Sequence, residues 1–188
     1  MKIISIHGSP RRRGNTAAAL DIFEREMHAR GHSTERILLA DVKVNPCKSC
    51  WRCAKSEDEN GCPQKDDAAG IFSKMAAADA IVYAVPLYCW CFPAQMKALI
   101  DRHVCLVKGF ETEKHTSLIG GKKTALLVTC EGPEKDNADL IQIVFDRMCG
   151  YALMKVTGKF IIPGCGMEPG SLPADAEEII RKMAASFD

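Results

Sequence analysis

KIISIHGSPRRRGNT, residues 2–16, is the stretch that decides the fold. Residues 2–7 form an isoleucine-rich apolar run, which is typical of a buried strand. A polar loop bounded by Gly8 and Gly14 follows, and a helical pattern begins at Asn15. This arrangement creates an anion site, because the first N–H groups of a helix are unpaired and lie at the positive end of its dipole. The hydroxyls, the amide and the three arginines of the loop therefore predict a bound phosphate monoester.

The spacing of the loop excludes two common nucleotide-binding motifs. Five residues separate Gly8 from Gly14, and Asn15 stands where a Walker loop needs lysine. The dinucleotide pattern Gly-x-Gly-x-x-Gly is also missing. The loop fits the flavodoxin-like pattern instead, in which hydroxyls and amides surround the terminal phosphate of FMN. An ordinary capped strand–helix turn is the alternative, but three adjacent arginines repel one another unless an anion is near.

Length and composition narrow the class of protein. A chain of 188 residues with 47% hydrophobic residues predicts a single domain, residues 1–188, with a substantial core. The net charge of +1 gives no surface for nucleic acid, and no apolar run is long enough to span a membrane. The N-terminus does not have the pattern of a signal peptide, so we expect a cytoplasmic protein. Ten cysteines then indicate metal, redox chemistry or buried thiols rather than structural disulfides.

Strand patterns alternate with helical patterns along the whole chain. Strands are expected at 2–7, 34–40, 80–85, 124–129 and 156–162. Helices are expected at 15–30, after Asp66-Asp67, and in the apolar patterns of Met96–Val104, Leu140–Met148 and Ile179–Phe187. This alternation predicts an α/β fold, a doubly wound five-stranded parallel sheet of flavodoxin-like order 2-1-3-4-5 with helices on both faces. Residues 41–65 form a Cys-rich insertion, and 107–121 are expected to be a loop.

Three loops should meet at one edge of this sheet, because ligands bind beyond the carboxyl ends of the strands where strand order reverses. They are residues 9–16, residues 86–92 and the segment Thr129, Cys130, Glu131 and Gly132. The second loop offers Tyr88 and Trp90 as flat surfaces, although either ring could instead pack in the core. A phosphate site at one end and an aromatic slot at the other suit FMN better than a small acid.

Several of these segments resemble the NAD(P)H-dependent FMN reductase family. Residues 8–16 resemble its FMN phosphate loop, and residues 86–88 and 94–102 resemble its second flavin loop and the following helix. Asp66-Asp67 also matches, and the cysteines of 47–62 are similar to those of the iron–sulfur flavoprotein branch. The resemblance implies a flavodoxin-like fold, one FMN per subunit and a homodimer or homotetramer. It also implies electron transfer through the flavin from NAD(P)H or from a redox protein.

The resemblance implies two sets of cofactor contacts. The phosphate would be held by Ser9, Arg11, Asn15 and Thr16. The ribityl chain and ring would be lined by Pro86, Leu87, Tyr88, Cys89 and Trp90. The chain departs from the family at residues 89–92, which are unusually bulky, and at 130–132, which lack a glycine pair often found there.

The cysteines of the insertion allow three interpretations. They are Cys47, Cys50, Cys53 and Cys62. Three closely spaced cysteines and a fourth from a loop suit a [4Fe–4S] cluster. Zinc is an alternative, although two Cys-x2-Cys pairs are its more usual spacing. The third interpretation is a set of free thiols that bind no metal.

Three functions are consistent with this pattern. The first is an FMN-dependent oxidoreductase that passes electrons from NAD(P)H to a quinone, a flavin or another small acceptor. The second is an electron-transfer iron–sulfur flavoprotein reduced by a ferredoxin-like partner, and the third is a redox or metal sensor. Structural roles are expected for His7 at a strand end and for His103 at a helix end, and Asp101-Arg102 is expected to be an intrahelical or interfacial charge pair. No catalytic acid or base is expected, because the flavin supplies the chemistry.

Overall fold

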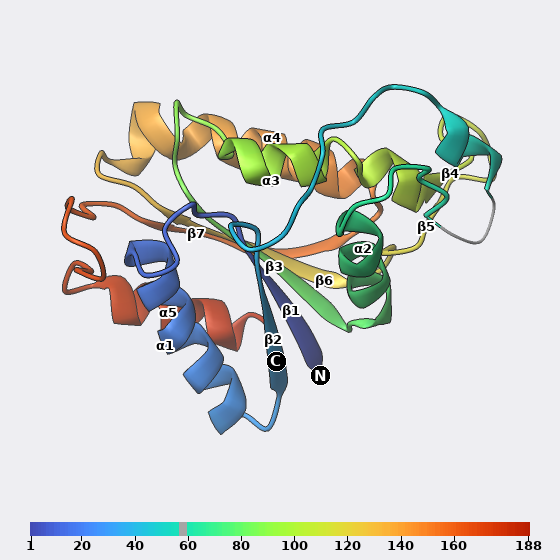
Figure 1. Cartoon of the computed structure of the whole chain (residues 1–188). Helices are drawn as coiled ribbons and strands as arrows, with labels where there is room; N and C mark the ends of the chain where they lie inside the picture. Colours follow the sequence, from blue (N-terminus) through green and yellow to red (C-terminus); the bar gives the residue numbers. More distant parts are fainter. Residues whose placement is uncertain (57–59) are drawn as a thin grey trace.

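A parallel five-stranded sheet forms the centre of the molecule. The structure is a computed structural model that describes residues 1–56 and 60–188. The strands run in the order β2-β1-β3-β6-β7 (Figure 1). Their bounds are β1 Lys2–His7, β2 Ser33–Leu38, β3 Ala80–Pro86, β6 Lys123–Thr129 and β7 Lys155–Ile162. This is the predicted order 2-1-3-4-5, because β4 Val107–Lys108 and β5 Thr116–Ser117 form a separate antiparallel pair. That pair lies in the segment expected to be a loop.

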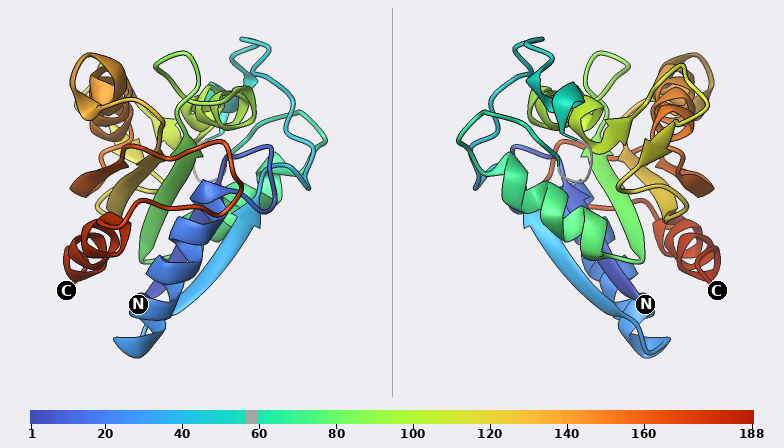
Figure 2. Two further views of the ribbon diagram at one scale, coloured as in Figure 1. Left: turned by 90° about the vertical axis from the view of Figure 1, so that its left-hand side faces the viewer. Right: turned by 90° about the vertical axis from the view of Figure 1, so that its right-hand side faces the viewer.

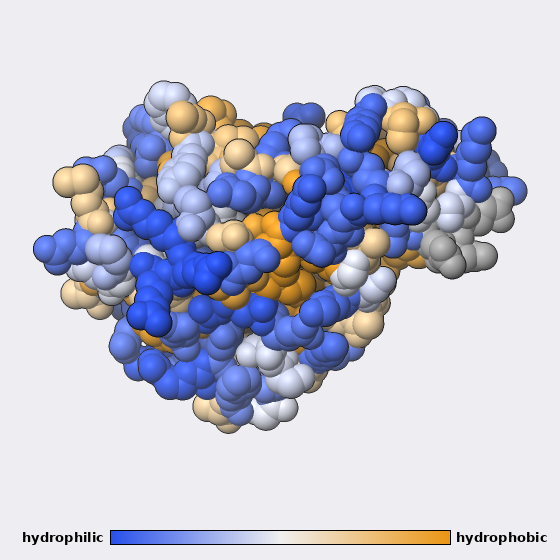
Figure 3. All heavy atoms as spheres, viewed as in Figure 1, coloured by the Kyte–Doolittle hydropathy of each residue, from blue (hydrophilic) through white to orange (hydrophobic). Residues whose placement is uncertain are grey.

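Helices cover both faces of the sheet, as predicted (Figures 1 and 2). Their bounds are α1 Asn15–Ala29, α2 Ala68–Ala77, α3 Ala94–Ile100, α4 Asp139–Tyr151 and α5 Ala176–Ala185. The apolar residues of α1 and α5 form one buried cluster with the sheet, and those of α2, α3 and α4 form another on the opposite face. The sheet is therefore buried on both sides, which explains why its central strands are almost wholly apolar. Hydrophilic side chains cover most of the face seen in Figure 3.

Gly8 lets the first loop pass close to side chains of β3 and α3. A Cβ at this position would lie 2.8 Å from Cγ1 of Val85 and 2.9 Å from Cε of Met96. The backbone N–H of Gly8 donates to the carbonyl oxygen of Ala84 at 2.8 Å. Glycine is thus needed so that β1 can remain paired with β3 to its last residue while the loop turns away.

Helix α4 buries a different face from the one that the sequence suggested. The buried side chains are Ile141, Phe145, Met148 and Cys149. Of the residues that predicted the helix, Met148 is buried, whereas Leu140, Ile143 and Val144 are exposed. The helix has apolar residues on two faces, so periodicity alone could not decide which face meets the sheet.

A buried ion pair joins the end of the insertion to the end of α3. Nη1 of Arg102 lies 2.5 Å from Oδ2 of Asp66, and the two side chains are 1% and 0% exposed. Oδ2 of Asp66 also accepts the backbone N–H of Asn45 at 2.8 Å. Burial alone would raise the pKa of Asp66, but the bond from Arg102 lowers it below the ordinary value. The expected pairing of Asp101 with Arg102 is therefore wrong, and Asp101 pairs with Lys97 one helical turn away.

Arg102→Met should lower the free energy of unfolding by about 3–5 kcal/mol, because it leaves the Asp66 carboxylate buried and without its counter-charge. Urea unfolding followed by circular dichroism measures the change. Lys97→Met breaks an exposed helical pair and is the control, with an expected loss of at most about 0.5 kcal/mol. Equal losses in the two variants would contradict the importance of the buried pair.

Two histidines are buried in the fold, as expected of structural residues. Neither ring nitrogen of His7 or of His103 has a hydrogen-bond partner among the described residues. Burial lowers the pKa of each to about 4, and the charge of Arg36 adds to the effect at His7. The ring of His103 instead contacts the edges of Phe72 and Tyr83, with centroids 6.0 and 5.9 Å away. Both histidines are therefore neutral in the folded protein near neutral pH.

The free energy of unfolding should fall as the pH is lowered from about 6.5 towards 4. In this range the two histidines are protonated in the unfolded chain but remain neutral in the folded protein. His103→Phe should reduce this slope by up to about 1.4 kcal/mol per pH unit. The measurement is urea unfolding at a series of pH values. Phe72→Leu, in the same cluster, should lower the free energy at every pH and leave the slope unchanged. A slope that His103→Phe does not alter would rule out this assignment.

Candidate functional site

A cavity of about 190 Å³ lies at the carboxyl ends of β1, β3, β6 and β7. The three predicted loops meet there, together with a fourth that follows β7. The predicted residues that line it are Ser9, Arg11, Asn15, Thr16, Pro86, Leu87, Tyr88, Thr129, Cys130 and Glu131. The edge of the sheet therefore gathers most of the residues that were selected from the sequence.

The first turn of α1 forms the polar end of this cavity. Gly14 is the residue before the helix, its backbone is extended, and no side chain caps the helix. The first N–H groups of α1 are consequently available to an anion. Arg11 lines the same end and forms no ion pair with any described residue, whereas Arg12 pairs with Asp41 at 2.6 Å. An uncapped helix start beside an unpaired guanidinium is suited to a phosphate group.

Three of the predicted phosphate ligands also bind within the protein. Asn15 donates from Nδ2 to the carbonyl oxygen of Gly166 at 2.9 Å and accepts the N–H of Gly170 at 2.8 Å. The hydroxyls of Thr16 and Thr129 lie 2.7 Å apart. The Ser9 hydroxyl accepts the N–H of Arg11 at 3.1 Å, so its own proton remains free to donate. Asn15 and Thr16 thus shape the polar end by holding its walls together.

Backbone hydrogen bonds fix the other walls of the cavity. The N–H of Leu87 donates to the carbonyl oxygen of Thr129 at 2.9 Å, which joins the second loop to the third. The N–H of Cys130 donates to Ile162 at 3.0 Å, and that of Cys165 donates to Cys130 at 2.9 Å. The cavity is therefore built on paired backbone at the ends of the strands rather than on free loop tips.

Cys89, Trp90 and Gly132 were predicted with this site but lie outside the cavity lining. Residues 88–91 form a tight turn in which Cys89 and Trp90 have φ values of 46° and 62°. Tyr88 and Trp90 are 44% and 56% exposed, so packing of these rings in the core is excluded. Tyr88 lines the cavity, whereas Trp90 does not.

Cys165, Gly166 and Met167 also line the cavity, although they were not predicted as site residues from the sequence. They follow β7 at the same edge of the sheet. The Gly/Pro-rich run after the last strand was the available signal, because every loop at this edge can reach the ligand.

The thiols of this cavity are held in their neutral form. Burial raises the pKa of Cys130 to about 11, and the neighbouring Cys165 adds to the effect. Burial also raises the pKa of Cys165 above its ordinary value. Neither group is a thiolate near neutral pH, so neither is an activated nucleophile.

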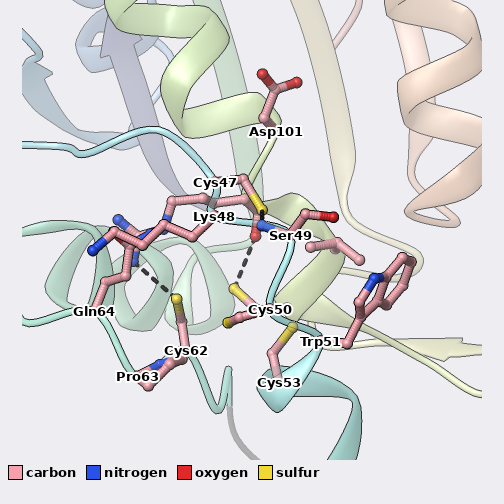
Figure 4. A pocket seen from close by; sticks show the side chains of 13 residues that line it. Cys47, Lys48, Ser49, Cys50, Trp51, Cys53, Cys62, Pro63, Gln64 and Asp101 are labelled. Atoms are coloured by element: carbon pink, nitrogen blue, oxygen red, sulfur yellow. Dashed lines mark hydrogen bonds between the residues drawn. The ribbon is translucent and has the colours of Figure 1, made fainter.

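A second cavity, of about 210 Å³, lies beside the insertion (Figure 4). Within its described residues, 41–56 and 60–65, the insertion contains one short helical turn, η1 Arg52–Lys55. The cavity is lined by all the cysteines that were predicted to bind a metal, Cys47, Cys50, Cys53 and Cys62. In the described part of the chain, however, no three His, Cys, Asp or Glu side chains lie close enough together to hold a metal ion. The donor types thus match a metal centre, but their present arrangement does not.

Two cations lie against this cysteine segment. Nη2 of Arg102 donates to the sulfur of Cys62 at 3.3 Å, and Nζ of Lys108 donates to the carbonyl oxygen of Cys53 at 3.2 Å. Burial raises the pKa of Cys53, and the nearby Cys62 adds to this rise. The ion pair of Arg102 with Asp66 therefore also positions one of the four cysteines.

Residues 1–144 match the sequence family described as NADPH-dependent FMN reductase. The chain belongs to this family. The resemblance stated from the sequence is thereby confirmed. The cavity at the carboxyl edge lies within the matched part of the chain, except for its wall at residues 165–167.

Curated relatives carry the name iron–sulfur flavoprotein. One from Methanosarcina thermophila is 40% identical over 106 residues, a match that covers 56% of this chain and 54% of the relative. The chain thus spans only about half the length of that relative. Another from Archaeoglobus fulgidus is 29% identical over 198 residues and covers 100% of this chain and 81% of the relative.

Solved structures show the same fold. An NAD(P)H:quinone oxidoreductase from Methanothermobacter marburgensis superposes with a TM-score of 0.73 at 22% identity, covering 98% of this chain and 95% of that one. An FMN-dependent NADH-azoreductase from Bacillus anthracis, in complex with FMN, gives 0.74 at 14% identity, covering 100% and 99%. Among the described residues, no helix is long and apolar enough to cross a membrane.

Arg11→Ala should weaken FMN binding by about 1.5–3 kcal/mol, the range expected for a lost hydrogen bond between charged groups. Fluorescence titration of the apoprotein with FMN measures the affinity. Arg13→Ala removes an exposed arginine that lies outside the cavity lining and should leave the affinity nearly unchanged. An effect at Arg13 but not at Arg11 would transfer the phosphate contact to the other arginine.

Proposed function

We propose that this protein is an FMN-dependent oxidoreductase that takes electrons from NAD(P)H and passes them to a small acceptor such as a quinone. The main support is the set of residues that line the cavity at the carboxyl edge. This lining combines the uncapped start of α1 and the unpaired Arg11 with Leu87 and Tyr88. The family match and the quinone and azo reductases among the similar structures support the same activity.

When bound, FMN supplies chemistry that exchanges either one or two electrons. The chain contributes binding and orientation. Arg11 and the first N–H groups of α1 would hold the phosphate, and Leu87 and Tyr88 would contact the apolar part of the cofactor. The neutral thiols of Cys130 and Cys165 would form an uncharged wall, which adds no negative charge beside the phosphate-bearing cofactor.

Anaerobic mixing of the FMN-loaded protein with NADH or NADPH tests the electron source. We expect the flavin absorbance near 450 nm to bleach, with a rate that saturates in the nucleotide. The alternative is an electron-transfer protein reduced by a ferredoxin-like partner. Bleaching by reduced ferredoxin, together with no bleaching by either nucleotide, would favour that alternative and overturn the reductase proposal.

The cysteine cavity supports a second proposal, that the protein carries a [4Fe–4S] cluster. All four cysteines of the motif line this one cavity, and curated relatives are named iron–sulfur flavoproteins. In the described arrangement the cysteines are too far apart to bind a metal, so their sulfur atoms would have to move closer together to ligate one cluster. The rival proposals are a zinc site, a free set of thiols, and a sensor in which this segment responds to redox state or metal.

Metal analysis of protein purified without oxygen distinguishes these rivals. A cluster predicts about four iron and four acid-labile sulfide per chain. Cys62→Ser should abolish both, whereas Cys149→Ser, which changes a buried cysteine of α4, should not. Zinc without sulfide would establish a zinc site, and the absence of both metals would leave free thiols or a sensor.

Self-association is a further part of the proposed function. Leu140, Ile143 and Val144 place an apolar strip on the outer face of α4. A strip of this kind is typical of a protein–protein interface. It supports the homodimer or homotetramer that the family resemblance implies.

A further inference from the structure

A third cavity, of about 640 Å³, lies next to the cysteine cavity and shares Trp51 and Val104 with it. Figure 4 shows the Trp51 ring to one side of the four cysteines, and none of those cysteines lines the third cavity. No residue that lines the cavity at the carboxyl edge takes part either. A cavity of this size is typical of a site for a small molecule, and neither the flavin nor the cysteine motif accounts for it.

Aromatic rings form the walls of this third cavity. The ring of Phe110 meets that of Tyr151 edge-on, with centroids 4.8 Å apart and an angle of 68° between the planes. The ring of His115 lies 5.4 Å from that of Phe110, and its Nε2 lies 3.0 Å from the carbonyl oxygen of Tyr151. The loop between β4 and β5 is therefore fastened to the end of α4. Trp51 adds a third ring, which is 66% exposed and makes no ring contact with any described residue.

Two opposite charges line the same cavity without forming an ion pair. The carboxylate of Glu111 and the ammonium of Lys108 pair neither with each other nor with another charged group among the described residues. Nζ of Lys108 donates one hydrogen bond, to the carbonyl oxygen of Cys53, so two of its three N–H groups stay free. The cavity thus combines aromatic walls with one free carboxylate and one free cation.

Backbone strain occurs at two of these positions. Trp51 and Glu111 have φ values of 56° and 62°, in the left-handed region that is unfavourable for a residue with a Cβ. Neither side chain offsets the strain with a hydrogen bond or an ion pair to a described residue. Such strain is retained mainly where it serves a ligand or a reaction. It is therefore a second observation, independent of the cavity, that points to a ligand here.

We propose that this cavity binds a small zwitterion that carries a quaternary ammonium group and a carboxylate on a short carbon chain. Aromatic faces attract quaternary ammonium groups, and the carboxylate of Glu111 adds to this attraction. Lys108 would bind the carboxylate of the ligand. A simple cation would leave Lys108 without a partner and repel it, a simple anion would do the same to Glu111, and a neutral aromatic ligand would use neither charge.

The test uses γ-butyrobetaine as the probe and Trp51 as the reporter. Trp90→Phe leaves Trp51 as the only tryptophan of the chain. Titration of this FMN-loaded variant with γ-butyrobetaine should give a saturable change in Trp51 emission. Two compounds of similar shape serve as controls, because 5,5-dimethylhexanoate lacks the positive charge and butyltrimethylammonium lacks the carboxylate. Each control should bind at least tenfold more weakly than the zwitterion.

Two substitutions in the same Trp90→Phe background remove one charge each. Glu111→Gln should raise the Kd for γ-butyrobetaine about tenfold. Its matched control is Glu113→Gln, which changes an exposed carboxylate of the same loop outside the cavity lining and should have no effect. Lys108→Met should also raise the Kd for γ-butyrobetaine about tenfold, but it should not weaken the binding of butyltrimethylammonium. This selective loss distinguishes a missing charge from a damaged fold.

Three results would overturn the proposal. Equal affinity for γ-butyrobetaine and 5,5-dimethylhexanoate would show that the ammonium group is not recognised. Equal affinity for γ-butyrobetaine and butyltrimethylammonium would remove the role of Lys108 and reduce the ligand to a cation. Trp51 emission that changes with protein concentration and with none of the probes would assign the cavity to a contact between copies of the chain. None of these measurements involves flavin reduction, so each outcome is independent of the proposed reductase function.

Discussion

The ion pair between Arg102 and Asp66 connects the two candidate sites of the molecule. Asp66 stands at the end of the Cys-rich insertion, and Arg102 stands just beyond α3, the helix that follows the second loop of the cavity. The same guanidinium also reaches the sulfur of Cys62. Two buried charges of this kind tolerate little movement, because separating them would leave each one without solvent and without its counter-charge. The Arg102–Asp66 pair therefore fixes the insertion relative to α3.

The second constraint is the parallel sheet itself. Its strands deliver four chain segments to one edge, and backbone bonds between Leu87 and Thr129, and between Cys130 and Cys165, fasten these segments to one another. The side chains at the cavity can then serve the ligand, because the backbone has already positioned the loops. This division explains how a polar end and an aromatic end can lie in one cavity with few titratable groups.

The sequence predicted well the features that depend on local pattern. Apolar runs located the strands, and the loop from Gly8 to Thr16 located one wall of the cavity, because both follow from neighbouring residues. It predicted poorly the features that depend on distant partners. Nothing near Asn15 indicates that its amide binds Gly166 and Gly170, and nothing near Arg102 indicates Asp66. Helix α4 has two apolar faces, and the sequence of the helix alone does not indicate which of them packs against the sheet.

The amide of Asn15 has a consequence for the biogenesis of the protein. It joins the beginning of the first helix to a loop about 150 residues later in the chain. A nascent polypeptide that has been synthesised only as far as β6 lacks the partners of the Asn15 hydrogen bonds. It also lacks the wall formed by Cys165, Gly166 and Met167. The cavity therefore reaches its full shape only after the chain has been synthesised as far as Gly170.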